Sequence, residues 1–340
     1  MKYRAVIENA IGETRAAVYE GRRLVELHLE RESQKSLPQT GDEYCARVTS
    51  LEPSLNGAFL DLGQNQQGFL TFMNNAAMPR LVEGIHIRVI VTRPETEEKN
   101  TTVRFLGEAE NNKAGLLWKN DLKNRLKTRF PKITFDEASV SVLDDAVERR
   151  IALKGGGAIT IDQTQALLAI DVDKGRAPKT LEVCLEAADM IAKQLRFRGL
   201  GGLVIIDFPN LRQTRQRNQL FKAVERAFEG DKATVKVAPV SRFGCVELTR
   251  SVDYPSLDSL MNTRFGEPTL ETQSLRALRQ LEREALANRG AQFVLSVSVV
   301  IGNWLEANTS IWESDLQGRI GERFKLLKGE GAGFTVQADR

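Results

Sequence analysis

The sequence has few of the residues that build disulfide, zinc or histidine-based sites. Its three cysteines, Cys45, Cys184 and Cys245, stand far apart among 340 residues, and no Cys-x-x-Cys pair occurs. They therefore cannot supply a disulfide framework or a closed zinc site within one chain. Because His28 and His86 are the two histidines, a paired-histidine acid–base mechanism would have to use both.

Long apolar stretches and an excess of one charge are also lacking. The longest apolar runs, such as 203–206 and 293–300, are far shorter than the roughly 18 residues of a membrane-spanning helix. The first eight residues lack the apolar core of a signal peptide. We therefore expect a cytoplasmic protein with no membrane partner. The net charge of 48 − 45 = +3 leaves any attraction for polyanions to local clusters.

The composition is that of a folded globular chain. Hydrophobic residues make up 41% and charged residues 27%, which excludes a disordered chain, a collagen and a coiled coil. A length of 340 residues predicts two or more domains.

The first half of the chain has the pattern of short strands. Residues 16–29 alternate around the turn Glu20–Arg22, which indicates a hairpin. Turn residues then separate four apolar segments. These segments are 44–51, 58–62, 68–72 and 86–91. Their spacing favours a small closed barrel of the OB type.

Phe59 and Phe69 lie in two of these barrel segments, each close to glycines. They have two interpretations. Either they are core side chains, the commoner place for phenylalanine, or they form an exposed surface on which the bases of a single strand stack.

The segment between the barrel and the second half is basic. Residues 113–132 hold seven basic side chains and one acidic one, Asp121, and such a run is a solvated helix face more often than a binding site. A short amphipathic helix is predicted over 144–151. The glycine triplet 155–157 precedes a strand rather than a helix, so it predicts a turn rather than a phosphate cradle.

The clearest chemical pattern begins after this triplet. A buried strand over 165–170 ends in Asp171 and Asp173, whose carboxylates share one face because side chains alternate along a strand. An amphipathic helix over 180–198 follows. A second buried strand, 203–206, then ends in Asp207. Strand, helix and strand in this order favour two parallel strands in one sheet.

Asp171 and Asp207 would then meet at the carboxyl edge of that sheet, where open sheets place their sites. Strands about 4.8 Å apart let two carboxylates share a cation, and Mg²⁺ is usually held by carboxylates together with substrate oxygens and water. The alternative is that each aspartate only caps the turn after its strand. The basic residues nearby suit a polyanionic phosphate substrate; they are Lys193, Arg196, Arg198, Arg212, Arg215, Arg217, Lys222 and Arg226.

Taken together, these segments resemble the RNase E/G family of bacterial endoribonucleases. The matching runs are Val48–Phe59, Gly68–Leu70, Gln163–Asp173, Leu185–Asp189, Leu200–Phe208 and Ser241–Gly244. The resemblance implies a mixed α/β and β fold class with four parts. An OB-type RNA-binding barrel (39–107) would be inserted in an RNase H-like subdomain split between 1–38 and 108–152. A DNase I-like catalytic subdomain (153–262) and a small α/β domain (263–340) would follow.

The resemblance also implies roles for single residues. Asp171 and Asp207 would hold the catalytic Mg²⁺, for which Mn²⁺ is a possible substitute, and Asp173 would help orient the attacking group. The RNA-binding residues would be Phe59, Phe69 and Arg242, with Arg212 and Arg215 added from the basic cluster after Asp207.

Three departures from the family pattern change what we expect. Asp173 stands where the family usually has Asn. The internal segment that recognises a 5′-monophosphate is missing between the barrel and the catalytic subdomain. Leu260–Gly266 has no cysteine where the family carries its zinc-linking motif. We therefore expect little preference for 5′-monophosphorylated RNA, no structural zinc and no zinc-linked dimer, with the oligomeric state open.

The function indicated is an Mg²⁺-dependent endoribonuclease that hydrolyses single-stranded RNA to 5′-phosphate and 3′-hydroxyl ends, in rRNA or mRNA processing or decay. A metal-free cyclising mechanism is disfavoured because His28 and His86 lie outside the predicted crossover. The alternative is an RNA-binding protein whose cleavage activity has decayed or become highly selective.

Overall fold

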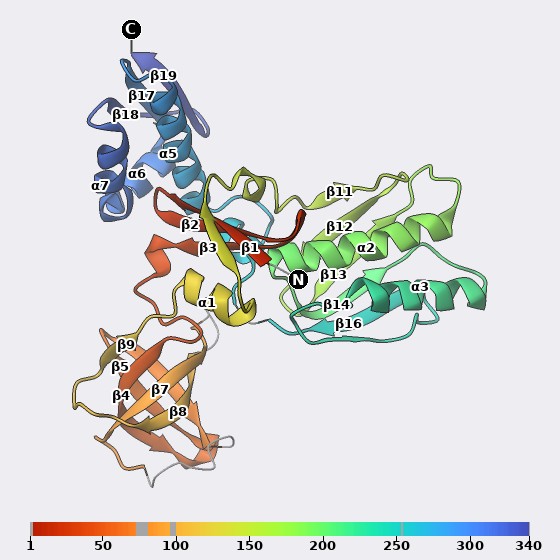
Figure 1. Cartoon of the computed structure of the whole chain (residues 1–340), viewed down its shortest axis with the longest axis horizontal. Helices are drawn as coiled ribbons and strands as arrows, with labels where there is room; N and C mark the ends of the chain where they lie inside the picture. Colours follow the sequence, from red (N-terminus) through yellow and green to blue (C-terminus); the bar gives the residue numbers. More distant parts are fainter. Residues whose placement is uncertain (1–2, 73–80, 96–99, 253, 340) are drawn as a thin grey trace. The chain divides into compact units, whose positions relative to one another are not determined.

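The computed structural model describes residues 3–72, 81–95, 100–252 and 254–339. The chain has a mixed α/β fold and divides into two compact units, Met1–Arg31 with Thr134–Arg340, and Glu32–Ile133 (Figure 1). None of the helices in the described residues combines the length and hydropathy that crossing a membrane requires.

The unit Glu32–Ile133 is built around a closed β-barrel of the OB type. Its strands are β4 (Glu43–Glu52), β5 (Gly57–Gly63), β6 (Gln66–Thr71), β7 (His86–Arg93) and β8 (Thr101–Glu108), with β9 (Gly115–Trp118) added beside β4. The ring closes because β4 pairs with both β5 and β7, while β6 runs parallel to β8. The four predicted strand segments coincide with β4 to β7, whereas the pattern did not locate β8 and β9.

The barrel is filled by the inward side chains of alternating positions, including Val48, Leu60, Leu70, Val89 and Val103. Two 3₁₀ turns, Glu32–Gln34 and Pro53–Leu55, precede β4 and β5, and the helix α1 (Leu122–Arg129) follows the barrel. Asp121 caps α1 by accepting a hydrogen bond from the Asn124 amide at 2.8 Å.

The other unit begins with a four-stranded sheet. Its strands are β1 (Tyr3–Ala10), β2 (Glu13–Glu20), β3 (Arg23–Arg31) and β10 (Thr134–Glu137), in the order β10-β1-β2-β3. The predicted hairpin around Glu20–Arg22 is confirmed as the β2–β3 connection.

The predicted helix over 144–151 is wrong. A 3₁₀ turn, Ser141–Leu143, is followed by turns and then by β11 (Arg150–Ala152). Asp144 accepts a hydrogen bond from Arg15, and β11 pairs with the next strand. These tertiary contacts outweigh the weak local helix propensity of the segment.

A six-stranded sheet follows and carries the predicted chemistry. It consists of β11, β12 (Ala158–Gln163), β13 (Leu168–Asp173), β14 (Gly202–Asp207), β15 (Val235–Val237) and β16 (Cys245–Arg250), in the order β11-β12-β13-β14-β16-β15. The helices α2 (Thr180–Arg198) and α3 (Thr214–Ala227) lie side by side over one face of this sheet (Figure 1). The predicted crossover is confirmed, since β13 and β14 are parallel neighbours joined by α2.

The chain ends in a small α/β assembly. It contains α5 (Leu270–Ala287), β17 (Gln292–Ser298), α6 (Val299–Ala307), α7 (Thr309–Ile320), β18 (Phe324–Gly329) and β19 (Phe334–Asp339). The short helix α4 (Leu257–Met261) before it packs instead against the first sheet, in a cluster with Ala17 and Leu27. Its three strands have the order β18-β17-β19. The helix α5 begins after the N-cap Thr269, whose hydroxyl accepts from the Thr272 amide at 3.2 Å.

Candidate functional site

The six-stranded sheet has one covered face and one open face. Leu168, Ile170 and Val172 of β13 point into a core shared with α2 and α3. The alternate positions of β13 point the other way, and there Asp171 and Asp173 are exposed. The alternation expected for a strand therefore places both carboxylates on the open face, away from the helices.

Strand register aligns five side chains in one row across this open face. The row runs Arg150 (β11), Thr160 (β12), Asp171 (β13), Asp207 (β14) and Cys245 (β16), and each residue is the register partner of the next. Register partners on neighbouring strands point to the same side of a sheet. The row therefore places the two predicted aspartates side by side at the carboxyl ends of parallel strands.

The two aspartates have the chemistry of a site for a hard cation. Asp171 and Asp207 are both exposed, so substrate and water can reach them. Among the described residues, no group of three or more His, Cys, Asp or Glu side chains is placed to hold a metal. A cation here would thus depend on two carboxylates plus water and substrate oxygens, which is the usual mode of Mg²⁺ binding.

Asp173 lies two residues beyond Asp171 and already has protein partners. It accepts a hydrogen bond from the Gly175 amide at 2.8 Å and pairs with Arg150 at 3.3 Å. The amide hydrogen bond, followed by Arg150, lowers the pKa of Asp173. Its carboxylate is therefore ionised and held in place by Gly175 and Arg150. It lies outside the row that contains Asp171 and Asp207.

The glycine triplet forms the turn beside Asp173, as predicted. Gly157 has φ +83°, and a Cβ at this position would approach the Asp173 carbonyl oxygen to 2.2 Å. Only glycine fits there. The turn therefore supports the carboxyl end of β13, and it opens the strand β12 rather than a helix.

Cys245 is the neighbour of Asp207 that the sequence pattern did not reveal. Its Sγ lies 3.9 Å from Oδ1 of Asp207. Burial, followed by the charge of Asp207, raises the pKa of the Cys245 thiol. The thiol is therefore neutral at pH 7 and adds no negative charge to the row.

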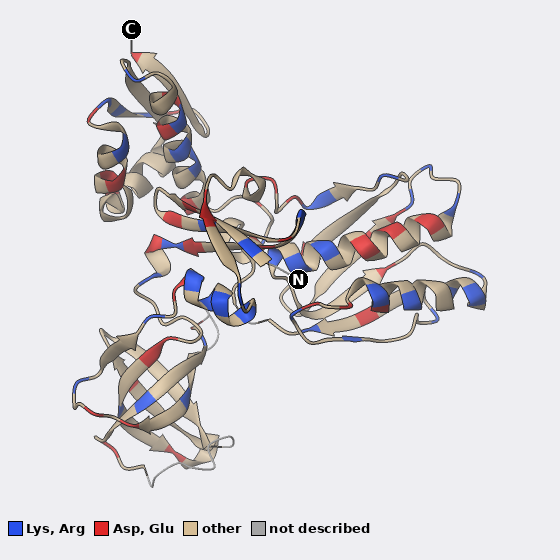
Figure 2. Cartoon of the chain, in the orientation of Figure 1, with Lys and Arg blue, Asp and Glu red and all other residues tan. Residues whose placement is uncertain are grey.

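The three arginines proposed to bind RNA are exposed and come from two connections. Two other predicted basic residues do not fit: Arg198 is buried and pairs with Asp258 at 3.2 Å, and Arg196 is half-buried and donates to the Ala227 carbonyl. Arg212 and Arg215 lie between β14 and the first turn of α3, and Arg242 lies in the turn between β15 and β16. One connection begins at β14, which ends in Asp207, and the other ends at β16, which pairs with β14. Figure 2 shows further lysines and arginines along α3.

Phe59 and Phe69 lie on the outer face of the barrel in the other unit. They are register partners on β5 and β6, and their ring centroids are 5.1 Å apart with an interplanar angle of 60°. Neither belongs to the barrel core, which is built by the alternate positions of the same strands. Both rings are half-buried, so one edge of the pair remains accessible.

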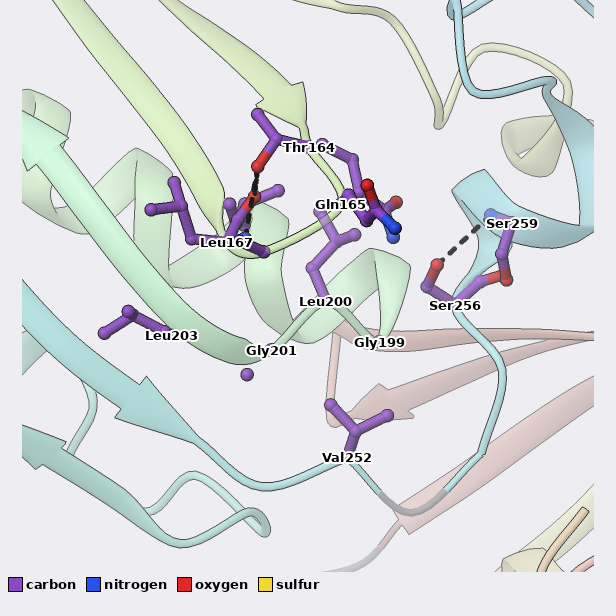
Figure 3. A pocket seen from close by; sticks show the side chains of 14 residues that line it. Thr164, Gln165, Leu167, Gly199, Leu200, Gly201, Leu203, Val252, Ser256 and Ser259 are labelled. Atoms are coloured by element: carbon purple, nitrogen blue, oxygen red, sulfur yellow. Dashed lines mark hydrogen bonds between the residues drawn. The ribbon is translucent and has the colours of Figure 1, made fainter. Parts of the chain in front are cut away.

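A cavity of about 250 Å³ lies at the opposite end of β13 and β14 from the two aspartates (Figure 3). Neutral side chains line it, including Gln165, Leu203, Ser256 and Ser259, with backbone of the Gly199–Gly202 loop. Since it has no carboxylate, this cavity is not a cation site and is separate from the row.

The pairing of Asp171 with Asp207 could be predicted because the strand, helix and strand that carry them follow one another directly in the sequence. Sequence reasoning missed Arg150, Thr160 and Cys245, which join the row through antiparallel pairing with strands distant along the chain. The polar alternation of β12 and β16 was the available signal, but without the register it does not show which residues meet.

Comparison with known proteins finds a family match for part of the chain. The family described as "Ribonuclease E/G family" matches residues 91–252, a stretch that holds the whole row of the open face. Over this stretch, just under half of the 340 residues, the chain is similar to that family.

Individual relatives agree with this match. The chain is 36% identical over 179 residues to "Ribonuclease E" of Haemophilus influenzae, which covers 48% of this chain and 19% of that protein. It is 28% identical over 195 residues to "Ribonuclease G" of Escherichia coli K12, covering 53% and 40% respectively. It is 33% identical over 153 residues to "Ribonuclease E/G-like protein, chloroplastic" of Arabidopsis thaliana, covering 42% and 15%. The matched part thus spans between about a seventh and two fifths of each relative.

Proposed function

We propose that the protein is a metal-dependent endoribonuclease that hydrolyses single-stranded RNA, with the pair Asp171 and Asp207 as its catalytic centre. The observation that carries this proposal is their register pairing at the exposed carboxyl edge of β13 and β14. Similarity to the ribonuclease E/G family over residues 91–252 supports RNA as the substrate, and RNA processing or decay as the role.

Asp171 and Asp207 would together hold one Mg²⁺, with Mn²⁺ as a substitute. When bound, such an ion polarises the scissile phosphate and lowers the pKa of a coordinated water. Hydrolysis by this route leaves a 5′-phosphate and a 3′-hydroxyl. Asp173 would act beside the pair, since its ionised carboxylate, held by Gly175 and Arg150, can orient an attacking water.

The basic residues would neutralise the phosphates of the bound strand. Arg212, Arg215 and Arg242 are exposed, and lysines or arginines that neutralise phosphates release counterions. In the barrel, the accessible edge of the pair Phe59 and Phe69 would stack on RNA bases. The subdivision into RNase H-like and DNase I-like subdomains, and a cytoplasmic location, belong to this proposal.

The test is cleavage of a fluorescent single-stranded RNA by the variants Asp171→Asn and Asp207→Asn. Both should lose Mg²⁺-dependent cleavage by at least a factor of about 100. Asp189→Asn is the matched control, because Asp189 is exposed on α2, which covers the opposite face of the sheet. If the two row variants cleave as fast as the control, the assignment of the catalytic centre is wrong.

The second candidate is an RNA-binding protein with decayed or highly selective cleavage. The missing 5′-monophosphate segment and the lack of zinc-linking cysteines in Leu260–Gly266 favour it. A Mg²⁺ titration of the same RNA separates the two candidates. Binding without cutting at any Mg²⁺ concentration would favour the second.

A further inference from the structure

Phe243 is the most exposed large hydrophobic side chain in the described part of the chain. Its relative exposure is 91%, against 75% for Phe265, the next highest. Full burial of a phenylalanine is worth roughly 1.5–3 kcal/mol, so a ring that gains none of this in the free protein has no role in the core.

The turn that carries Phe243 is firmly bonded. The Ser241 amide donates to the Cys245 carbonyl at 2.8 Å, and the Gly244 amide donates to the Ser241 carbonyl at 3.2 Å. The Cys245 amide donates to the Ser241 hydroxyl at 3.2 Å. These three hydrogen bonds hold the turn in one conformation, so the ring is presented to solvent at a defined place.

That place is close to the row of the open face. Cys245, two residues after Phe243, is the register partner of Asp207. Two Cα–Cα steps of 3.8 Å and one cross-strand step of about 5.5 Å bring the Phe243 Cα within roughly 13 Å of the Asp207 Cα. At a stacked rise of about 3.4 Å per nucleotide, this is a reach of at most about four nucleotides.

We propose that Phe243 stacks on a base of the bound RNA, within about four nucleotides of the phosphate held at Asp207. The proposal rests on the proposed function and adds a base-binding subsite to it. An RNA strand is favoured over a protein partner because the ring is flanked by Arg242, which is exposed and has no ion pair within the described residues. An isolated aromatic next to a free cation matches the stacking and charge of single-strand binding sites.

The experiment measures Kd for a fluorescent single-stranded RNA in EDTA, so that no cleavage is needed. Phe243→Ala should raise Kd by about 5- to 150-fold, the range for loss of one base–aromatic stack. Phe243→Trp should restore binding to within about threefold of wild type, because tryptophan also stacks. Phe265→Ala is the matched control, since it removes another exposed ring, and should leave Kd unchanged.

A set of RNAs with one base removed at each position completes the test. At one position, removal of the base should weaken binding to the wild type but not to Phe243→Ala, because the stack is already lost. The proposal is overturned if Phe243→Ala binds like Phe265→Ala, or if every abasic RNA weakens both proteins equally. It is also overturned if Phe243→Ala leaves Kd for RNA unchanged but lowers the molecular mass measured by light scattering. That result would assign the ring to a contact between two copies of the protein.

The outcomes also separate this inference from the proposed function. A wild type that binds RNA through Phe243 but cuts none with Mg²⁺ would contradict the proposed cleavage alone. A wild type that cuts RNA, with Phe243→Ala unchanged in Kd, would contradict the stacking alone.

Discussion

Replacing Glu13 by Gln should destabilise the unit that contains the row by about 3–5 kcal/mol, the cost of removing one partner from a buried ion pair. The Glu13 side chain is 1% exposed and lies among three arginines. Its carboxylate is 2.9 Å from Arg15, 2.6 Å from Arg31 and 2.5 Å from Arg279. The contacts with Arg15 and Arg31 lack hydrogen-bond geometry. They therefore stabilise the protein through the attraction of opposite charges and not through directed hydrogen bonds.

The size of the effect follows from the charge balance of this cluster. Three arginines face three carboxylates, those of Glu13, Glu8 and Asp144. The substitution changes the balance from zero to +1, and it removes the charge at Glu13, the most buried of the three carboxylates. It keeps the side-chain volume, so no cavity term adds to the loss. Because Arg279 lies on α5 and Glu13 on β2, the cluster also joins the C-terminal assembly to the first sheet.

The assay is urea denaturation followed by far-UV circular dichroism and tryptophan fluorescence, because urea is uncharged and does not screen ion pairs. The control is Asp136→Asn. It breaks the ion pair between Asp136 and Arg4, whose side chains are 53% and 49% exposed, respectively. This loss should lower the free energy of unfolding by less than about 1 kcal/mol. If Glu13→Gln is no less stable than Asp136→Asn, the buried charge of Glu13 does not stabilise this unit.

Three further predictions concern acid stability, the barrel and the metal. Burial raises the pKa of Asp144, but the hydrogen bond and charge of Arg15 outweigh it and lower the pKa overall. A carboxyl group with a lowered pKa stabilises the folded protein at pH values above its unfolded pKa of about 3.9. The stability deficit of Asp144→Asn should therefore be constant near pH 7 and shrink below about pH 4, and a deficit independent of pH in urea titrations would contradict this. Gly57→Ala should destabilise the barrel by about 1–3 kcal/mol, because the new Cβ would lie 2.3 Å from a ring carbon of Phe69. The control Gly107→Ala adds a Cβ with no atom within 4 Å, and it should leave thermal unfolding unchanged. Asp173→Asn should raise the Mg²⁺ concentration for half-maximal cleavage by about 10-fold, and an unchanged titration would show that this carboxylate does not influence the ion.

The parts of the fold that were predictable are those set by local periodicity. The predicted helix over 180–198 has the same bounds as α2. Its apolar positions recur at 3–4 spacing, so they lie on one face of the helix that packs against the sheet. The pairing of Asp171 with Asp207 was also predictable, because a short crossover leaves parallel strands as neighbours.

The parts that were missed depend on contacts between distant segments. The segment 144–151 has helical periodicity but is drawn instead into pairing and a salt bridge with Arg15. Likewise Cys245 meets Asp207 only through the antiparallel register of β16 with β14, which no local pattern determines. The division of the chain into four subdomains stays a prediction.

If Asp171 and Asp207 bind one divalent ion, a wild-type crystal soaked in Mn²⁺ should reveal it by anomalous scattering. One strong peak should lie in contact with a carboxylate oxygen of each aspartate, and it should disappear in Asp207→Asn. A map with no peak between these two side chains, or with a peak that persists in Asp207→Asn, would contradict this binding.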